Sequence, residues 1–305
     1  MPIVSMKDLL ERARSGGYAI GYFEAWDQYS MEASLEAAEQ AAAPAIIGFG
    51  GAVVDQGWLD RGGLEQWAVL ACTLAHRSAL PVAVLCNEVN TFAHVLRALR
   101  AGCNAVMLDT SAFAFARNAE LTAKVVEAAH AVGATVEAEI GHLPDASTLG
   151  SAQPDLGMRT DPDEAGRFVE LTGVDALAVS VGNTHNLAAG ESAVDMELVA
   201  RLRDAAGVPL VIHGGTGFPA WAVREVIARG VAKFNVGTRL KQAYLDALRA
   251  ALAVPVQVAS VHDIVGSRSG TDPLLAARQA VADQIAPLIA LYGAAGKAAD
   301  WARGN

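Results

Sequence analysis

The sequence is poor in cysteine and shows no sign of a targeting segment. Its three cysteines, Cys72, Cys86 and Cys103, are too few and too scattered for a disulfide framework, and no Cys-x-x-Cys pair indicates structural zinc. We therefore expect a reducing, cytoplasmic location. The N-terminus has no basic segment followed by an apolar one, and the apolar runs are short, so we expect neither a secretion signal nor a membrane-spanning segment.

Positive charge is scarce as well. The chain has 23 Lys and Arg against 33 Asp and Glu, a formal net charge of −10. This sign disfavours broad contact with the phosphates of nucleic acids or with anionic lipid, so we expect no nucleic acid and no membrane as partners. A small phosphorylated substrate stays compatible with the charge, because a few backbone amides can hold one phosphate locally.

Hydrophobic residues make up 52% of the 305 residues, and they form short apolar runs that alternate with helical patterns. No proline- or serine-rich linker separates these runs, so we expect one domain over 1–305. Strands each followed by a helix predict an α/β fold, a (β/α)8 TIM barrel. The expected strands are 17–23, 44–50, 81–88, 105–111, 135–141, 176–182, 209–215 and 233–238.

Two segments lie outside this alternation. An additional apolar helix is expected near 272–295, where it either covers the barrel or mediates contact between copies of the chain. The irregular stretch 142–160 is either a lid or a surface excursion.

Polar residues near the carboxyl ends of the predicted strands are the candidates for chemistry, because these ends meet at one mouth of the barrel. Two histidines and several carboxylates at one mouth can hold a divalent metal. Each residue alone has a simpler structural explanation; Glu137, for example, could face outward into the helix layer. The candidates are Asn87, Glu88, Asp109, Glu137, Glu139, His185, His213 and Asn235.

Several segments carry a family resemblance. They include GYAIGYFEAWD at 17–27, GCNAVMLDTSAF at 102–113, ATVEAEIG at 134–141, IHGGTG at 212–217 and KFNVGT at 233–238. In this order the chain resembles, nearly end to end, the class II (metal-dependent) ketose-bisphosphate aldolases, the fructose-bisphosphate aldolase family. The resemblance implies a lyase that cleaves or forms a carbon–carbon bond through an enediolate stabilised by a metal.

The resemblance also implies metal ligands. His185 and His213 match two of the three zinc-binding histidines of the family. The family's His-Leu-Asp-His block is replaced by the residues 85–88, so that Glu88 stands for the third histidine and Asn87 for the catalytic aspartate. We expect Glu88, His185 and His213 to bind a divalent metal, zinc foremost, with manganese, cobalt or iron compatible.

The catalytic proton transfer has more than one candidate. An amide such as Asn87 does not exchange protons at neutral pH. Glu88 is therefore either a metal ligand, which we favour, or the general base in place of the missing aspartate. Asp109 and Glu139 are expected to support the metal site. We place Asn87, Glu88, Asp109 and Glu139 in the catalytic group.

Glycines after the last strands suggest an anion site. Turns of this kind let backbone N–H groups approach a phosphate, although a tight turn needs glycine for geometry alone. The candidates for binding substrate or phosphate are Gly182, Gly214, Gly215, Thr216, Asn235, Gly237 and Thr238.

Substrate-facing positions depart from the family pattern. Glu24, Gly50 and Gly237 replace an asparagine, a serine and an aspartate of the family. We therefore expect an aldolase for a ketose, phosphorylated by analogy with the family, whose specificity differs from that of fructose-bisphosphate aldolase. The alternatives are an isomerase or epimerase that uses the same enediolate, and a non-catalytic ligand-binding protein. A homodimer or homotetramer is expected.

Overall fold

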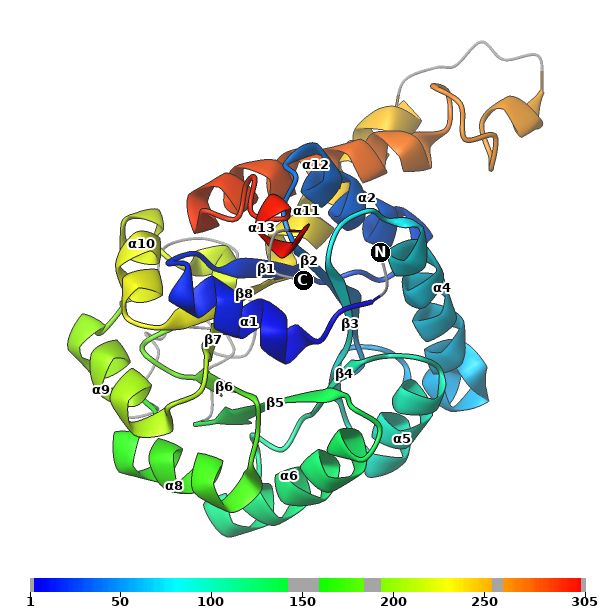
Figure 1. Ribbon diagram of the computed structural model, residues 1–305. Helices are drawn as coiled ribbons and strands as arrows, with labels where there is room; N and C mark the ends of the chain where they lie inside the picture. The colour runs from blue at the N-terminus through cyan, green and yellow to red at the C-terminus, as the bar shows by residue number, and fades with distance from the viewer. Residues whose placement is uncertain (1–2, 142–158, 184–192, 254–259, 303–305) are drawn as a thin grey trace, which may run out of the picture.

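The computed structural model describes residues 3–141, 159–183, 193–253 and 260–302. Eight parallel strands close into a barrel in the order β1 to β8, and helices surround it (Figure 1). The barrel closes where β1 pairs with β8 along Ile20–Phe23. The strands are β1 (Ile20–Phe23), β2 (Ala45–Gly50), β3 (Val82–Val89), β4 (Ala105–Leu108), β5 (Thr135–Ile140), β6 (Ala176–Val179), β7 (Leu210–Ile212) and β8 (Val231–Val236).

The longer helices cover the outside of the barrel. They are α1 (Met6–Ser15), α2 (Gln28–Gln40), α4 (Leu64–Arg77), α5 (Phe92–Arg100), α6 (Phe115–His130), α8 (Pro162–Thr172), α9 (Met196–Ala206), α10 (Ala220–Ala228), α11 (Thr238–Ala253) and α12 (Pro273–Tyr292). Short helical segments are α3 (Gln56–Trp58), the π-helical turn Leu59–Gly63, the 3-10 turns Gly215–Gly217 and Val261–Asp263, and α13 (Ala299–Ala302).

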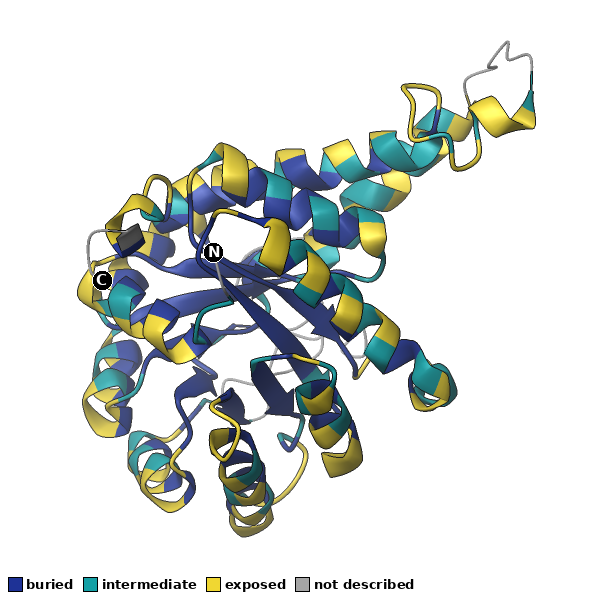
Figure 2. Cartoon of the chain, turned by 45° about the vertical axis from the view of Figure 1, so that its right-hand side comes forward, coloured by how far each residue is buried: buried dark blue, intermediate teal, exposed yellow. Residues whose placement is uncertain are grey.

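The eight predicted strands are confirmed, and their burial explains the apolar runs. The strands are buried over nearly all their residues, while the helices expose their outer faces (Figure 2). A parallel strand covered by helices on one face and by the barrel interior on the other needs apolar residues on both faces. The predicted strand 209–215 is longer than β7, which ends at Ile212. Gly214 has a left-handed conformation (φ 68°), which a strand cannot contain. In contrast, β8 begins at Val231, before the predicted start at 233.

Polar residues at the helix ends explain where the helices begin and end. Asp27 and Ser30 form a capping box at the start of α2. Asp161 caps α8 at its first turn, which begins with Pro162, and Gly173 ends α8 in the left-handed conformation. These signals are local, and they are readable from the sequence.

Helix α12 packs along α11 and α2 and also contacts β1 of the barrel; the alternative role expected for it, contact between copies of the chain, stays a prediction. Arg278 of α12 is paired with Glu32 and Glu36 of α2. Within the described residues, α12 is also the one helix long and apolar enough to cross a membrane by length and composition, a test that core helices pass as well. Most of the candidate lid, 142–158, lies outside the described residues.

Candidate metal centre and active site

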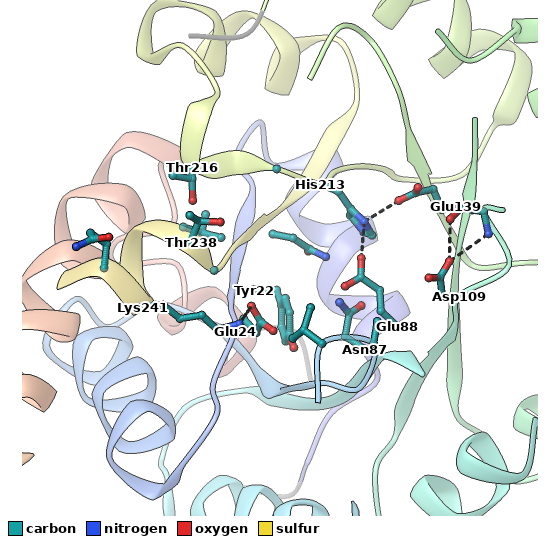
Figure 3. A pocket seen from close by; sticks show the side chains of 18 of the residues that line it. Tyr22, Glu24, Asn87, Glu88, Asp109, Glu139, His213, Thr216, Thr238 and Lys241 are labelled. Carbon is teal, nitrogen blue, oxygen red and sulfur yellow. Dashed lines mark hydrogen bonds and ion pairs between the residues drawn. The ribbon is translucent and has the colours of Figure 1, made fainter. Parts of the chain in front are cut away.

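A cavity of about 480 Å³ opens at the carboxyl ends of the strands (Figure 3). It contains the four expected catalytic residues, Asn87, Glu88, Asp109 and Glu139, together with His213. The other described residues that line it are Tyr22, Glu24, Ala52, Val53, Ser111, Gly214, Thr216, Asn235, Val236, Gly237, Thr238, Lys241, Gln242 and Leu245. His185, the third expected ligand, lies outside the described residues.

An irregularity at the end of β3 presents Glu88 to the cavity. The register between β3 and β4 shifts between Cys86 and Val89, and Glu88 has a positive φ of 48°. A glutamate in the left-handed region is uncommon, and such conformations cluster at functional sites because the surrounding fold must hold them. The backbone of β3 therefore departs from regular pairing at a candidate ligand.

Three carboxylates surround the buried imidazole of His213. Its Nδ1 lies 3.0 Å from Oε1 of Glu88 and 2.7 Å from Oε2 of Glu139. On the other side of the ring, Nε2 lies 3.0 Å from Oε1 of Glu137. Because a carboxylate accepts hydrogen bonds, Glu137 favours a proton on Nε2 and turns Nδ1 toward Glu88 and Glu139.

Glu137 is itself held by a buried lysine. Lys233 Nζ lies 2.8 Å from Oε2 of Glu137, and both side chains are 0% exposed. Glu137 and Glu139 are two residues apart on β5, so they share one face of the strand. The alternative that Glu137 faces outward into the helix layer is wrong, because its contacts with Lys233 and His213 place it inside the barrel.

The charges in this group shift the pKa values of its members. Burial lowers the pKa of His213, but Glu139, Glu137 and Glu88 more than offset it, so that the pKa is raised well above its ordinary value. Burial works to raise the pKa of Glu137, yet Lys233 and His213 reverse the shift and lower it. Glu137 thus stays ionised beneath the imidazole, and the group as a whole favours a positive charge between its carboxylates.

The donor set fits a divalent cation. One donor atom each from Glu88, Glu139 and His213 lies within 4.8 Å of the others. Two carboxylates that converge on one point repel each other unless a positive charge lies between them, and imidazole and carboxylate are ordinary ligands of zinc, manganese and iron. Glu139, expected to support the site, is in a position to be a ligand.

Three buried polar atoms on the cavity wall have no hydrogen-bond partner among the described residues: Asn87 Oδ1, Asn235 Nδ2 and the Tyr22 hydroxyl. Buried polar groups in folded proteins nearly always have partners, so each unsatisfied atom calls for an explanation. Their common position on one cavity points to a polar ligand. Asn235 is also fixed on its other side, where its Oδ1 accepts a hydrogen bond from Lys233.

Asp109 extends the polar wall beyond Glu139. Its Oδ1 accepts hydrogen bonds from the backbone N–H of Ser111 at 3.2 Å and from the Ser111 hydroxyl at 2.8 Å (Figure 3). These bonds orient a carboxylate that lines the cavity. Asp109 is therefore an oriented carboxylate on the cavity wall, a group that the amide of Asn87 does not provide.

The structure places some of the expected anion-binding residues on the cavity wall and others away from it. Gly214, Thr216, Asn235, Gly237 and Thr238 line the cavity. Gly215 and Gly182 are not among the described residues that line it. A Cβ at Gly215 would meet the Asn235 carbonyl oxygen at 2.8 Å, and one at Gly182 would meet that of Ala193 at 1.7 Å. Close backbone approach accounts for these two glycines.

Some residues of the site were not singled out from the sequence. Tyr22 precedes the end of β1 by one residue, and Lys233 precedes the candidate Asn235 by two, so the alternation along each strand could have revealed them. Lys241 lies in the first turns of α11, where a lysine ordinarily indicates a solvated surface. Only the folded arrangement brings it to the cavity.

Comparisons with known proteins bear on the family and the fold of the chain. The model of the family "Fructose-bisphosphate aldolase class-II" matches residues 4–297. YdjI of Escherichia coli K12 is 35% identical over 232 residues, 76% of this chain and 81% of YdjI. The crystal structure of the YdjI aldolase superposes with a TM-score of 0.79 at 31% identity, over 97% of this chain and 99% of that one.

A more distant structure has the same fold. Fructose-bisphosphate aldolase from Campylobacter jejuni gives a TM-score of 0.76 at 18% identity, with 97% of each chain covered. The family model spans nearly the whole chain, and the carboxylates and the histidine of the cavity lie on strands of the expected barrel or directly after them. By these observations, the chain belongs to the class II fructose-bisphosphate aldolase family.

Proposed function

We propose that the protein catalyses a reversible aldol reaction on a ketose and depends on a divalent metal. The observation that carries the proposal is the convergence of Glu88, Glu139 and His213 at the mouth of an aldolase-family barrel. Family membership supports a lyase, and the unsatisfied polar atoms of Tyr22, Asn87 and Asn235 support a polar, hydroxylated ligand.

Glu88 and His213 would hold the metal, with Glu139 and the family-pattern ligand His185 as further donors. When bound, a divalent cation withdraws electron density from a ketone and so stabilises the negative charge that develops as the bond breaks. Zinc is the first candidate. The carboxylate at Glu88 is also compatible with manganese, cobalt or iron.

The remaining chemistry is proton transfer. In the cleavage direction, a base accepts the hydroxyl proton of the carbon that becomes the aldehyde, and the electron pair of that O–H bond forms the aldehyde C=O. The electron pair of the broken carbon–carbon bond passes to the ketone fragment as an enediolate. A proton then returns to carbon to give the product ketone. We assign the base to Asp109, which Ser111 orients. Glu88 is the alternative base if it does not bind the metal.

Family membership points to a sugar phosphate as substrate. The family pattern assigns the phosphate of the ketone fragment to the turns after β7 and β8, near Thr216 and Thr238, and the Glu24 carboxylate borders the same place. Cytoplasmic location and assembly into a homodimer or homotetramer remain predictions; cell fractionation and light scattering test them. The three cysteines are free thiols, as a reducing compartment requires.

A screen of ketoses and ketose phosphates with metal-reloaded protein tests the proposal, with chelator-treated protein as the control. We expect metal-dependent release of an aldehyde and a shorter ketone. We also expect fructose 1,6-bisphosphate to be cleaved with kcat/KM below about 10⁴ M⁻¹s⁻¹, the lower end of the usual enzyme range. A stoichiometric metal with no cleaved or condensed product across the screen would contradict the proposal.

The amide at Asn87 favours a second candidate, an isomerase or epimerase. An epimerase forms the same enediolate but removes a proton from one carbon and returns it to the opposite face of that carbon, so the hydroxyl proton acceptor that Asn87 replaces is not required. An isomerase moves, in addition, a hydroxyl proton between the two oxygens of the enediolate. Analysis of the products distinguishes the two reactions, because isomerisation conserves the carbon chain whereas aldol cleavage shortens it.

A further inference from the structure

The side chain of Glu24 fills space that two glycines leave empty. Glu24 follows β1, and its carboxylate lies in the cavity (Figure 3). A Cβ added at Gly50 would lie 2.7 Å from Oε1 of Glu24, and one added at Gly237 would lie 2.2 Å from Oε2. A side chain at either position therefore competes with the Glu24 carboxylate for the same volume.

These three positions depart together from the family pattern described above. Residue 24 lies after β1, residue 50 ends β2 and residue 237 follows β8. The three strands are neighbours across the closure of the barrel. The exchange is therefore one local rearrangement: a carboxylate is introduced from β1, and both neighbouring side chains are removed to make room for it.

The Glu24 carboxylate also lies at the start of α11, where a phosphate is expected. Gly237 directly precedes α11, and Nζ of Lys241 in its first turns lies 3.0 Å from Oε2 of Glu24. A helix N-terminus favours an anion, and here the anion is part of the protein. The N–H of Arg239, in the same turn, is donated to Thr216 Oγ1 at 3.2 Å.

The charge of Glu24 disfavours a second anion at this place. Glu88 and Glu139 belong to the proposed metal site, where a cation offsets their charge, whereas Glu24 lies beside Gly237. Among the described residues that line the cavity, Lys241 is the lone lysine or arginine. Lys241 already pairs with Glu24. A phosphate between the β7 and β8 turns would approach the Glu24 carboxylate, and like charges at short distance repel. A hydroxyl there can instead donate a hydrogen bond to the same carboxylate.

We propose that Glu24 is a specificity-determining residue that selects a free hydroxyl, rather than a phosphate ester, at the substrate end that lies between β1 and β8. The proposal rests on the proposed aldol function and deepens it: the ketone fragment is an unphosphorylated polyol. The Glu24 side chain is 19% exposed and lines the cavity, so a substrate hydroxyl can reach it.

The test measures how fast the metal-loaded protein exchanges solvent deuterium into dihydroxyacetone and into dihydroxyacetone phosphate. Proton NMR of the two ketones follows the exchange. We expect the wild type to exchange dihydroxyacetone with the higher kcat/KM. Glu24→Gln should shift the ratio of the two kcat/KM values toward the phosphate ester by about tenfold or more, since a charged hydrogen bond is lost and a repulsion is removed. Glu24→Asp keeps the charge and should keep the preference.

Glu120→Gln is the matched control, because Glu120 also pairs with a lysine but lies on the surface of α6. It should leave the ratio unchanged. A wild type that prefers the phosphate ester, with Glu24→Gln weakening that preference, would overturn the proposal while leaving the aldolase function intact.

Titration with inorganic phosphate by calorimetry separates the proposal from the proposed function. We expect weak binding to the metal-loaded wild type and about tenfold tighter binding to Glu24→Gln, with Glu120→Gln like the wild type. If neither ketone exchanges deuterium but phosphate binding changes in this way, the aldol function fails and the role of Glu24 stands. If phosphate binds the wild type and Glu24→Gln equally, the role of Glu24 fails.

Discussion

Two lysine–glutamate pairs of similar length serve opposite purposes in this barrel. Lys233 and Glu137 are 2.8 Å apart and entirely buried, whereas Lys241 and Glu24 are 3.0 Å apart with side chains 41% and 19% exposed. Glu137 of the buried pair forms a hydrogen bond with Nε2 of His213. The pair at the rim borders the space where substrate would lie. The two pairs consist of the same residue types and differ in burial. We therefore expect the buried pair to stabilise the fold and the partly exposed pair to be able to contact a ligand.

The largest expected effect is on stability, and it comes from replacing the lysine of the buried pair. Lys233→Met leaves Glu137 buried without its cation, and we expect a loss of about 3–5 kcal/mol in the free energy of unfolding. Lys241→Met removes a partly exposed partner and should cost less than about 1 kcal/mol. Urea denaturation of the two variants measures the difference. Equal losses would show that burial does not distinguish the pairs.

Glu88 provides the next test, on the metal side of the cavity. If Glu88 is a ligand, Glu88→Gln should lose metal and Glu88→His should keep it, because imidazole can coordinate in the same place. Elemental analysis and turnover are measured on both variants. Both side chains need the same left-handed backbone, which makes the comparison fair. Full metal occupancy in both variants, with turnover reduced by about 10²–10⁴-fold, would identify Glu88 as the base instead.

Glu137→Gln tests whether the buried pair acts through His213. The amide keeps the shape of the side chain but removes the charge that favours a proton on Nε2. We expect metal affinity to fall by about 10–100-fold, measured by competition with a chelator. Glu120→Gln is again the surface control. Unchanged metal affinity in Glu137→Gln would mean that the geometry of His213 does not depend on the charge beneath it.

The smallest effect should appear at the rim. Gly237→Ala places a Cβ where Oε2 of Glu24 lies, so the carboxylate must move and its pairing with Lys241 is disturbed. We expect a cost of about 0.5–1 kcal/mol, within the range of exposed ion pairs. The cost should vanish when Glu24 is replaced by alanine, which a double-mutant cycle in urea detects. Additive effects would show that the two positions are independent.

Sequence patterns predicted the barrel well and the cavity only in part. The apolar runs identified each strand, because a buried parallel strand needs apolar residues on both faces. The polar ends of these runs gave Asn87, Glu88, Asp109 and His213. The left-handed backbone of Glu88 could not be predicted, since it depends on the shift in pairing between β3 and β4.

The coupling of Glu24, Gly50 and Gly237 also escaped the sequence. Each departure from the family pattern was visible, but nothing local indicates that the three residues touch. Their contact depends on β1 being the neighbour of both β2 and β8. Lys241 was missed for a similar reason, because helical spacing places a lysine on a surface without showing what that surface faces.

The barrel closes by pairing its first strand with its last, so during synthesis β1 is made long before β8. Glu24 and Lys241 are separated by 217 residues along the chain. A ribosome extends a chain by about 5–20 residues each second, so β1 waits for roughly ten seconds or more before its partner β8 exists. During that interval β1 has an unpaired edge, and the cavity has no rim on the β8 side. The nascent chain is therefore exposed to aggregation until its last strand emerges.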